Sequence, residues 1–189
     1  MQFHTRFMFS ASVLAVQFFA LGATTYADDG SVWHVKAVHP EGRLLDVKVI
    51  GSDGTIHDVK ALAANRHLLE VKALVGDKKL PVKVLVSDNK FAPVKAIDEN
   101  GTILDLKALT PDGKKLDVKG VKRQGNIYHI KAISADGKEF FGVKAIAPNG
   151  HVYDVKGIKM YDEHVEGKIS GVPIAAHIKA LPQAPADDE

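Results

Sequence analysis

The sequence contains no cysteine, and this absence excludes several kinds of chemistry at once. Disulfide bonds, thiolate metal sites and thiol nucleophiles all need that side chain. An excess of charge of one sign is missing too, because 25 basic residues stand against 23 acidic residues. A net charge of +2 gives no electrostatic reason to expect nucleic acid or an anionic membrane surface as a partner. Stability must therefore come from packing and backbone pairing.

Long apolar runs are absent except near the amino terminus. A polar segment containing Arg6 precedes an apolar stretch from Met8 to Ala23, and small residues follow up to Ala27. This layout is typical of a cleaved signal peptide, although a retained membrane anchor has a similar pattern. We expect the mature chain to be exported, either periplasmic or secreted, with no transmembrane span after signal removal.

The chain divides into three parts on this reading. We expect residues 1–27 to be the signal peptide, residues 28–181 to form one β-repeat domain and residues 182–189 to be an acidic tail. The middle part has the usual size of a single domain and is long enough to bury a core.

A repeat of about twelve residues fills the middle part. The unit reads GTILDLKAL between Gly101 and Leu109, and tight-turn sequences such as PDG and ENG separate the units. Eight β-prone residues between turns predict a strand, because twelve residues are too few for a strand plus a helix. Each unit carries one lysine at the same place: Lys36, Lys48, Lys60, Lys72, Lys83, Lys95, Lys107, Lys119, Lys131, Lys144, Lys156, Lys168 and Lys179.

The turns predict an antiparallel register. If residues 110–114 form a type I turn with a glycine bulge, Lys107 lies opposite Asp117. The shorter repeat that ends at Lys83 keeps this pairing through a two-residue turn and sets Glu70 against Lys83. Every strand pair built in this way places lysine against the acid position of its neighbour. A parallel solenoid is the competing arrangement, and it stacks lysine upon lysine with a like-charge penalty.

We therefore predict an all-β fold, an antiparallel meander of about 12–13 short strands in a closed or nearly closed shallow barrel. Thr102 and Thr110 close the turns at the two ends of one strand, and their backbone groups point the same way. Either the turns alternate in type or each strand bends, and Pro81 and Pro93 in mid-strand favour a bend. Bent strands let hairpins splay outwards like petals. A sheet of this many strands leaves an apolar channel inside or flattens into a sandwich.

The repeat lysines are candidates for an anion site. The simpler interpretation is a structural ladder of cross-strand ion pairs. Acids are scarcest around Pro81 and Pro93, where Lys83, Lys95 and Lys107 each keep an acid on only one side. These three lysines are our candidate anion contacts.

Three histidines, His34, His129 and His177, replace the acid two places before the lysine. If the first and last strands meet, His34 and His177 lie close enough to share a metal or to form a pH-sensitive seam. The alternative is that histidine is simply another polar partner in the ladder. We expect no metal and no cofactor, and we retain His34 and His177 as candidate ligand contacts.

Catalytic patterns are not visible. No serine lies in a G-x-S-x-G elbow, and the glycines are spread one per turn instead of forming a phosphate loop. We expect a protein that is not an enzyme.

The units Val59-Lys60-Ala61-Leu62, Val143-Lys144-Ala145-Ile146 and Asp154-Val155-Lys156-Gly157-Ile158 resemble those of a group of bacterial exported VKAI-type repeat proteins. That group resembles the β-flower fold, a shallow pseudo-symmetric barrel with hairpin petals. The resemblance covers about Ser31 to Leu181 and implies no particular activity.

Two functions follow as expectations. The first is a binding or scaffold module of the cell envelope, which engages a lipid-like molecule or another envelope protein. The second is a purely structural protein that associates with copies of itself.

Overall fold

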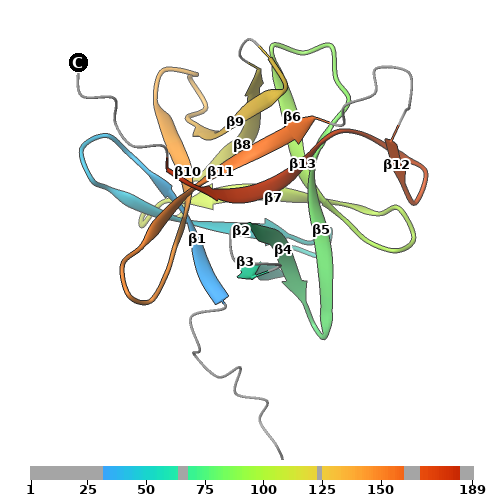
Figure 1. Cartoon of the computed structure of the whole chain (residues 1–189), viewed down its shortest axis with the longest axis horizontal. Helices are drawn as coiled ribbons and strands as arrows, with labels where there is room; N and C mark the ends of the chain where they lie inside the picture. The colour runs from blue at the N-terminus through green and yellow to red at the C-terminus, as the bar shows by residue number, and fades with distance from the viewer. Residues whose placement is uncertain (1–31, 64–67, 123–124, 160–166, 184–189) are drawn as a thin grey trace, which may run out of the picture.

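A computed structural model describes residues 32–63, 68–122, 125–159 and 167–183. The predicted signal peptide lies outside these residues, as does most of the predicted acidic tail. Strands make up most of the described chain (Figure 1). They are β1 (Val32–Val38), β2 (Leu44–Ile50), β3 (Ile56–Ala63), β4 (Leu69–Val75), β5 (Lys78–Leu85), β6 (Phe91–Ile97), β7 (Ile103–Leu109), β8 (Lys115–Lys122), β9 (Ile127–Ile133), β10 (Phe140–Ile146), β11 (Val152–Lys159), β12 (Gly167–Ile169) and β13 (Val172–Pro182).

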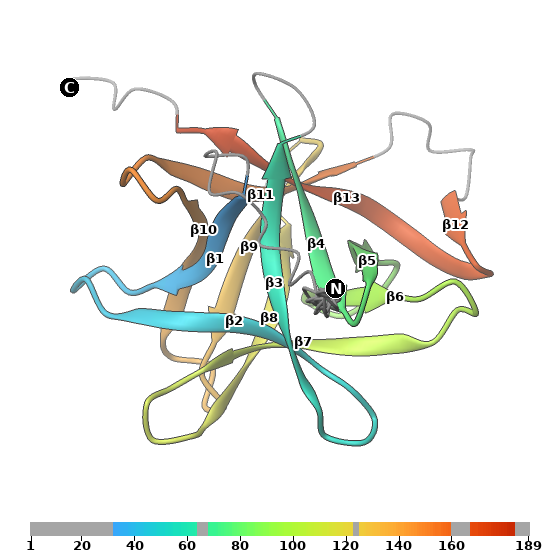
Figure 2. The same ribbon diagram turned by 90° about the horizontal axis from the view of Figure 1, so that it is seen from below.

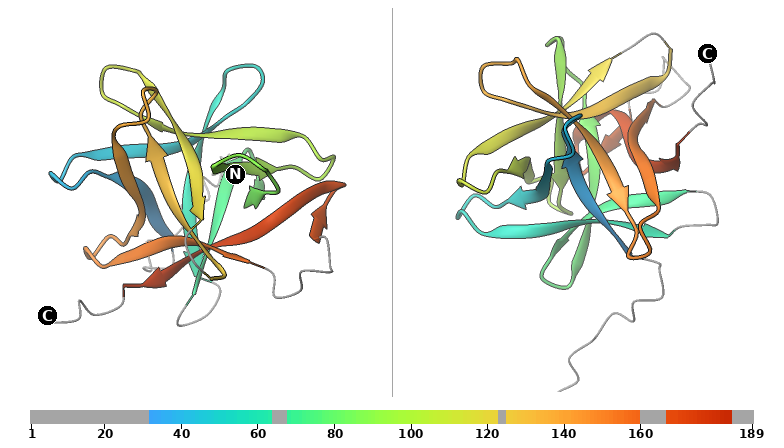
Figure 3. Two further views of the ribbon diagram at one scale, coloured as in Figure 1. Left: turned by 90° about the horizontal axis from the view of Figure 1, so that it is seen from above. Right: turned by 90° about the vertical axis from the view of Figure 1, so that its left-hand side faces the viewer.

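The 13 strands of the described residues form a single antiparallel sheet that closes into a ring. The strands are not spread evenly around one axis, so the sheet is barrel-like without being a regular barrel (Figure 3). The prediction of an all-β antiparallel fold with a closed sheet is confirmed. No segment among the described residues forms a helix long and apolar enough to cross a membrane.

Twelve of these strands form four groups of three. Within a group each strand pairs with both others over two to four residue pairs, as β1, β2 and β3 do. The other groups are β6, β7 and β8, then β9, β10 and β11, and finally β4, β5 and β13. The short β12 adds a hairpin to β13. The sheet therefore contains four places at which three strands pair with one another.

Six further ladders join the groups: β1–β10, β2–β7, β3–β4, β5–β6, β8–β9 and β11–β13. Each group is thereby joined to the other three, as the corners of a tetrahedron are joined by its edges. Figures 2 and 3 show the result, a closed body from which hairpins such as β2–β3 and β7–β8 project in several directions.

Lysine faces lysine in all six of these ladders, for example Lys36 opposite Lys144. The expectation that every strand pair sets lysine against an acid is confirmed at hairpins, where Lys107 lies opposite Asp117, and is wrong for these ladders. The reason is that facing lysines send their ammonium groups to different groups of strands. Lys36 bonds to Asp46 of β2, whereas Lys144 bonds to Asp154 of β11.

The bend predicted for the strands follows from this arrangement. Lys95 pairs with Asp105 near the start of β7, and Asp117 pairs with Lys107 near its end, while β2 occupies the opposite edge of β7. Both hairpin neighbours thus share one edge, and they also pair with each other. A strand whose two halves pair with different neighbours along one edge must bend between them.

The turns have the predicted geometry. Thr110 donates its backbone N–H to the carbonyl of Lys114 at 3.0 Å, and Gly113 donates to the carbonyl of Thr110 at 2.9 Å. Gly113 has a φ of 82°, which a residue with a side chain adopts only with strain. The turn chemistry therefore sets the hairpin register.

Alternate residues of each strand fill the interior. The apolar residue before each lysine of these twelve strands is at most 4% exposed, and the alanines and valines after the lysine are not exposed at all. Burial of each such valine contributes roughly 1.5–3 kcal/mol to stability. None of these side chains borders an open channel, because each is at most 4% exposed.

Candidate ligand sites: four lysine rings and a hollow between hairpins

The outer face of each three-strand group carries three lysines and the three residues that precede them by two. We call these sets rings and name each by its first lysine. They are the Lys36 ring (Lys36, Lys48, Lys60 with His34, Asp46, Asp58), the Lys72 ring (Lys72, Lys83, Lys179 with Glu70, Pro81, His177), the Lys95 ring (Lys95, Lys107, Lys119 with Pro93, Asp105, Asp117) and the Lys131 ring (Lys131, Lys144, Lys156 with His129, Gly142, Asp154).

The Lys36 ring is the most completely paired. Asp58 accepts from Lys48 at 2.5 Å and lies 3.2 Å from the ammonium group of Lys60. Lys60 also contacts Nδ1 of His34 at 3.0 Å, and Lys36 bonds to the remaining acid, Asp46. The hydrogen bond from Lys48 holds the pKa of Asp58 below its usual value, although partial burial opposes this. Cations and their partners thus alternate around a surface depression of about 280 Å³.

The Lys95 ring has two carboxylates and one proline. Lys107 bonds to Asp117 of β8, while Lys48 of β2 lies opposite it on the other edge, so a neighbouring strand supplies an acid on only one side, as predicted. Asp105, on the same strand as Lys107, also lies 3.6 Å from its ammonium group. Lys95 bonds to Asp105, and Pro93 lies opposite Lys119.

The Lys131 ring has a glycine where the others have a side chain. Asp154 bonds to Lys144 and lies 2.9 Å from Lys156, which also contacts Nδ1 of His129 at 3.1 Å. Gly142 lies opposite Lys131 in the ladder. This ring therefore holds three lysines and a single carboxylate.

The Lys72 ring also contains one carboxylate, but its charges are shared less evenly. Glu70 accepts from Lys179 at 2.6 Å and from Lys72 at 2.9 Å, and these two bonds lower its pKa to about 2. The third lysine, Lys83, contacts Nδ1 of His177 at 2.6 Å. The predicted pairing of Glu70 with Lys83 is wrong, because β13 inserts beside β4 and presents Lys179 to that carboxylate.

Lys83 is the least compensated lysine of this ring. Among the described residues it contacts no carboxylate, since Pro81 stands at the acid position of its own strand. Burial, followed by repulsion from Lys72 and Lys179, lowers the pKa of Lys83 to about 8. Burial also lowers the pKa of His177, and the neighbouring lysines lower it further. The lysine is thus kept beside a neutral imidazole.

The structure separates the five candidate residues into three rings. It brings Lys83 and His177 into direct contact, and it places Lys95 beside Lys107 in another ring. His34 lies in the Lys36 ring, so the idea that it shares a metal with His177 is wrong, since β1 and β13 belong to different groups. No cluster of metal-ligating side chains occurs among the described residues.

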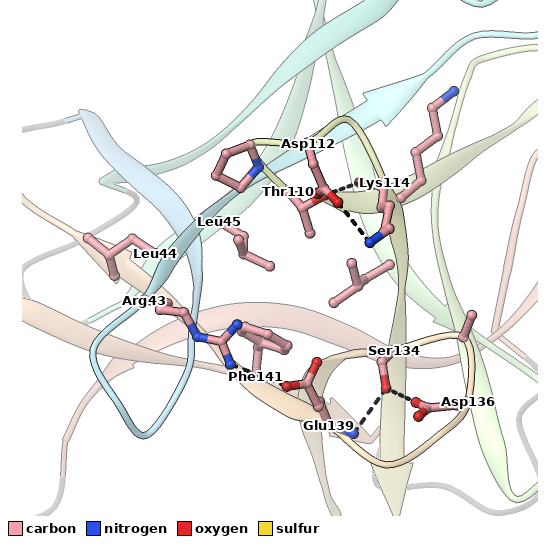
Figure 4. A pocket seen from close by; sticks show the side chains of 14 residues that line it. Arg43, Leu44, Leu45, Thr110, Asp112, Lys114, Ser134, Asp136, Glu139 and Phe141 are labelled. Carbon is pink, nitrogen blue, oxygen red and sulfur yellow. Dashed lines mark hydrogen bonds and ion pairs between the residues drawn. The ribbon is translucent and has the colours of Figure 1, made fainter.

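A hollow of about 890 Å³ lies between three hairpin tips, those of β1–β2, β7–β8 and β9–β10. Leu45, Leu116 and Phe141 supply apolar lining and are themselves almost fully buried. Figure 4 shows the Leu45 side chain directed into the space enclosed by the three hairpins. Leu44 lies at its edge and is 54% exposed.

Charged residues stand around this hollow. Arg43 donates to Glu139 at 3.2 Å and lies over the ring of Phe141, 5.5 Å from its centre (Figure 4). Lys114 pairs with Asp112 at 2.8 Å on the facing hairpin. Sequence reasoning missed this site, because its three walls are far apart in the chain. Leu44, an exposed apolar residue directly after the β1–β2 turn, was the available signal.

Comparison with known proteins gives one match. The model of a family of unknown function, DUF7486, matches residues 30–181. No curated protein and no solved structure matches the chain.

Proposed function

The chain belongs to the DUF7486 family of unknown function, and we propose that it is an exported, non-enzymatic binding module of the cell envelope. On this proposal, the ligand is a lipid-like molecule with an apolar part and an anionic head, held between the hairpins. The observation that carries the proposal is the hollow with an apolar floor and charged residues of both signs, Lys115 among them, at its rim.

The size and lining of the hollow support such a ligand. A space of about 890 Å³ is in the usual range for sites that bind small molecules. Apolar side chains on the floor favour a hydrocarbon segment. At the rim Arg43 and Lys114 already pair with Glu139 and Asp112, and Lys115 is the cation of the described lining that can meet a negatively charged group. The interior of the sheet is filled along the described strands, so a ligand must bind on the outside.

Export rests on the sequence alone. The signal-like residues 1–27 support a periplasmic or secreted location. The likeness to exported VKAI-type repeat proteins and to the β-flower fold agrees with such a location and stays a prediction.

Native mass spectrometry tests the ligand. Protein extracted gently from its own source should carry an apolar molecule of defined mass, and repeated absence of any such mass contradicts the proposal. Leu44→Glu should lower occupancy about tenfold, the effect of losing the burial of one leucine. Ile56→Glu is the matched control, since Ile56 has the same place after its turn, is 53% exposed and does not line the hollow.

Self-association is the second candidate, and exposed apolar side chains on several hairpins favour it. Large apolar residues at strand starts stand open to solvent on several hairpins: Leu44, Ile56, Ile103, Ile127, Phe140 and Val152. Such residues are suited to contacts between copies of the chain. Light scattering over a range of concentrations should show a rising mass on this alternative and a constant monomer mass on the first.

A further inference from the structure

The Lys36 and Lys72 rings match strand by strand. β1 corresponds to β13, β2 to β4 and β3 to β5, because each strand holds the same position in its group. His34 then corresponds to His177, and Asp46 to Glu70. The third correspondence is between Asp58 and Pro81.

Asp58 and Pro81 occupy the same place but differ in charge. Asp58 lies opposite Lys48 in the ladder and two residues before Lys60, and its carboxylate contacts both. Pro81 lies opposite Lys72 and two residues before Lys83. In the Lys72 ring Lys72 and Lys83 therefore flank the position of Pro81, which has no carboxylate.

We propose that the Lys72 ring binds a small oxyanion of the phosphate type, held by Lys72 and Lys83 in the position that the Asp58 carboxylate occupies in the Lys36 ring. Three lysines of this ring stand against one carboxylate, Glu70, which is already shared by Lys72 and Lys179. This site is separate from the hollow between the hairpins, because β4, β5 and β13 supply none of the residues that line the hollow.

The surroundings of Lys83 support the assignment. His177 contacts its ammonium group from β13, and Lys95 of β6 lies opposite it in the ladder but bonds to Asp105. Neither neighbour offers Lys83 a negative charge. A bound oxyanion supplies that charge, and a charge-assisted hydrogen bond to it is among the stronger polar contacts in proteins.

Binding must also alter the protonation of Lys83. The pKa of the free side chain is lowered to about 8 by burial and by Lys72 and Lys179, while Glu70 opposes this shift. An adjacent anion favours the ammonium form, so phosphate should raise this pKa and cause proton uptake near pH 8. Affinity should in turn fall as the pH rises from 7 to 9.5, because Lys83 then loses its charge.

Titration of the full chain with inorganic phosphate tests the proposal. Lysine side-chain NMR should show saturable shifts centred on Lys83, together with the rise in its pKa. Pro81→Asp should lower phosphate affinity about tenfold or more, because the new carboxylate fills the site from within. Lys83→Gln should do the same, while Lys60→Gln, the matched change in the Lys36 ring, should leave affinity within about twofold.

A second experiment decides whether the anion is a lipid headgroup or a free ion. Vesicles of phosphatidylglycerol in phosphatidylcholine are compared with inorganic phosphate on the same variants. If Pro81→Asp abolishes binding of phosphate or of the vesicles, that result supports the site. Binding of the vesicles identifies a lipid headgroup as the ligand, and binding of phosphate alone identifies a free anion. The proposal is overturned if neither probe causes saturable shifts of the lysine signals. It is also overturned if Lys60→Gln and Lys83→Gln lower the affinity for the probe equally. Thermal unfolding of each variant establishes that it is folded.

Discussion

The Lys36 and Lys72 rings have the same backbone arrangement, yet one is nearly balanced in charge and the other is not. The difference lies in one acid position, which is Asp58 in the first ring and Pro81 in the second. In the first ring every lysine contacts a carboxylate, whereas in the second Lys83 contacts an imidazole and, within the described part of the chain, no carboxylate. The comparison shows that backbone pairing and the buried valines build a ring, while its outer charges can vary without changing the fold.

Removal of the single carboxylate of the Lys72 ring should have the largest effect on stability. Glu70→Gln leaves three lysines with no acid, and we expect the free energy of unfolding to fall by about 1–2 kcal/mol after allowance for solvent screening. Screening matters because the Glu70 side chain is 37% exposed. Urea unfolding at pH 7 measures the change.

The pH dependence of this difference has a definite sign. The folded-state pKa of Glu70 is lowered to about 2 from an ordinary 4.5, so its stabilisation is present above pH 4.5 and is lost as the pH falls toward 2. Wild type and Glu70→Gln should therefore converge in stability at about pH 2. A gap that persists unchanged at that pH contradicts the ion-pair explanation.

The corresponding loss in the Lys36 ring should be smaller. Asp58→Asn keeps the shape of the side chain and leaves Asp46 within 4.0 Å of Lys48. We expect destabilisation of about 0.5–1 kcal/mol, the range of partly exposed ion pairs. Urea unfolding under the same conditions gives the comparison, and a loss larger than that of Glu70→Gln would reverse our ranking of the two rings.

Neutral replacements of the equivalent lysines Lys60 and Lys83 should change the free energy of unfolding differently. Lys60→Gln removes contacts with Asp58 and should destabilise the protein by roughly 0.5 kcal/mol. Lys83→Gln removes a partly buried cation that contacts no carboxylate of the described residues, so it should leave stability unchanged or raise it slightly. Thermal unfolding in phosphate-free buffer at pH 7 is the measurement. Equal destabilisation by both variants would show that Lys83 is as well compensated as Lys60.

Local features of the fold were predictable from the sequence, and long-range ones were not. The turn at 110–114 closes within five residues, so the pairing of Lys107 with Asp117 follows from turn chemistry. The ladder that sets Lys36 opposite Lys144 joins distant segments, and no local rule selects which strand takes the free edge. A meander pairs each strand with its neighbours in sequence, so the prediction did not include this ladder.

The candidate site divides in the same way. Pro81 and Pro93 indicated a region where acids are scarce, but Glu70 was expected opposite Lys83 and pairs with Lys179 instead. The contact of Lys83 with His177 and the hollow between three hairpins depend on how the groups are joined. The idea of a shared site for His34 and His177 was wrong for the same reason.

The smallest expected difference concerns these two histidines. Burial lowers the pKa of both histidines. Lys60 and then Lys36 lower the pKa of His34 further, and Lys83 and then Lys179 lower that of His177. A lowered histidine pKa contributes stability above pH 6.5 that is lost as the pH falls below it.

Two aspartates oppose the shift at His34, whereas only Glu70 opposes it at His177. His177→Gln should therefore remove more of the stability loss below pH 6.5 than His34→Gln. Unfolding of both variants at pH 7 and pH 5 measures this, and a larger effect at His34 would mean that carboxylates in the Lys36 ring do not moderate its histidine.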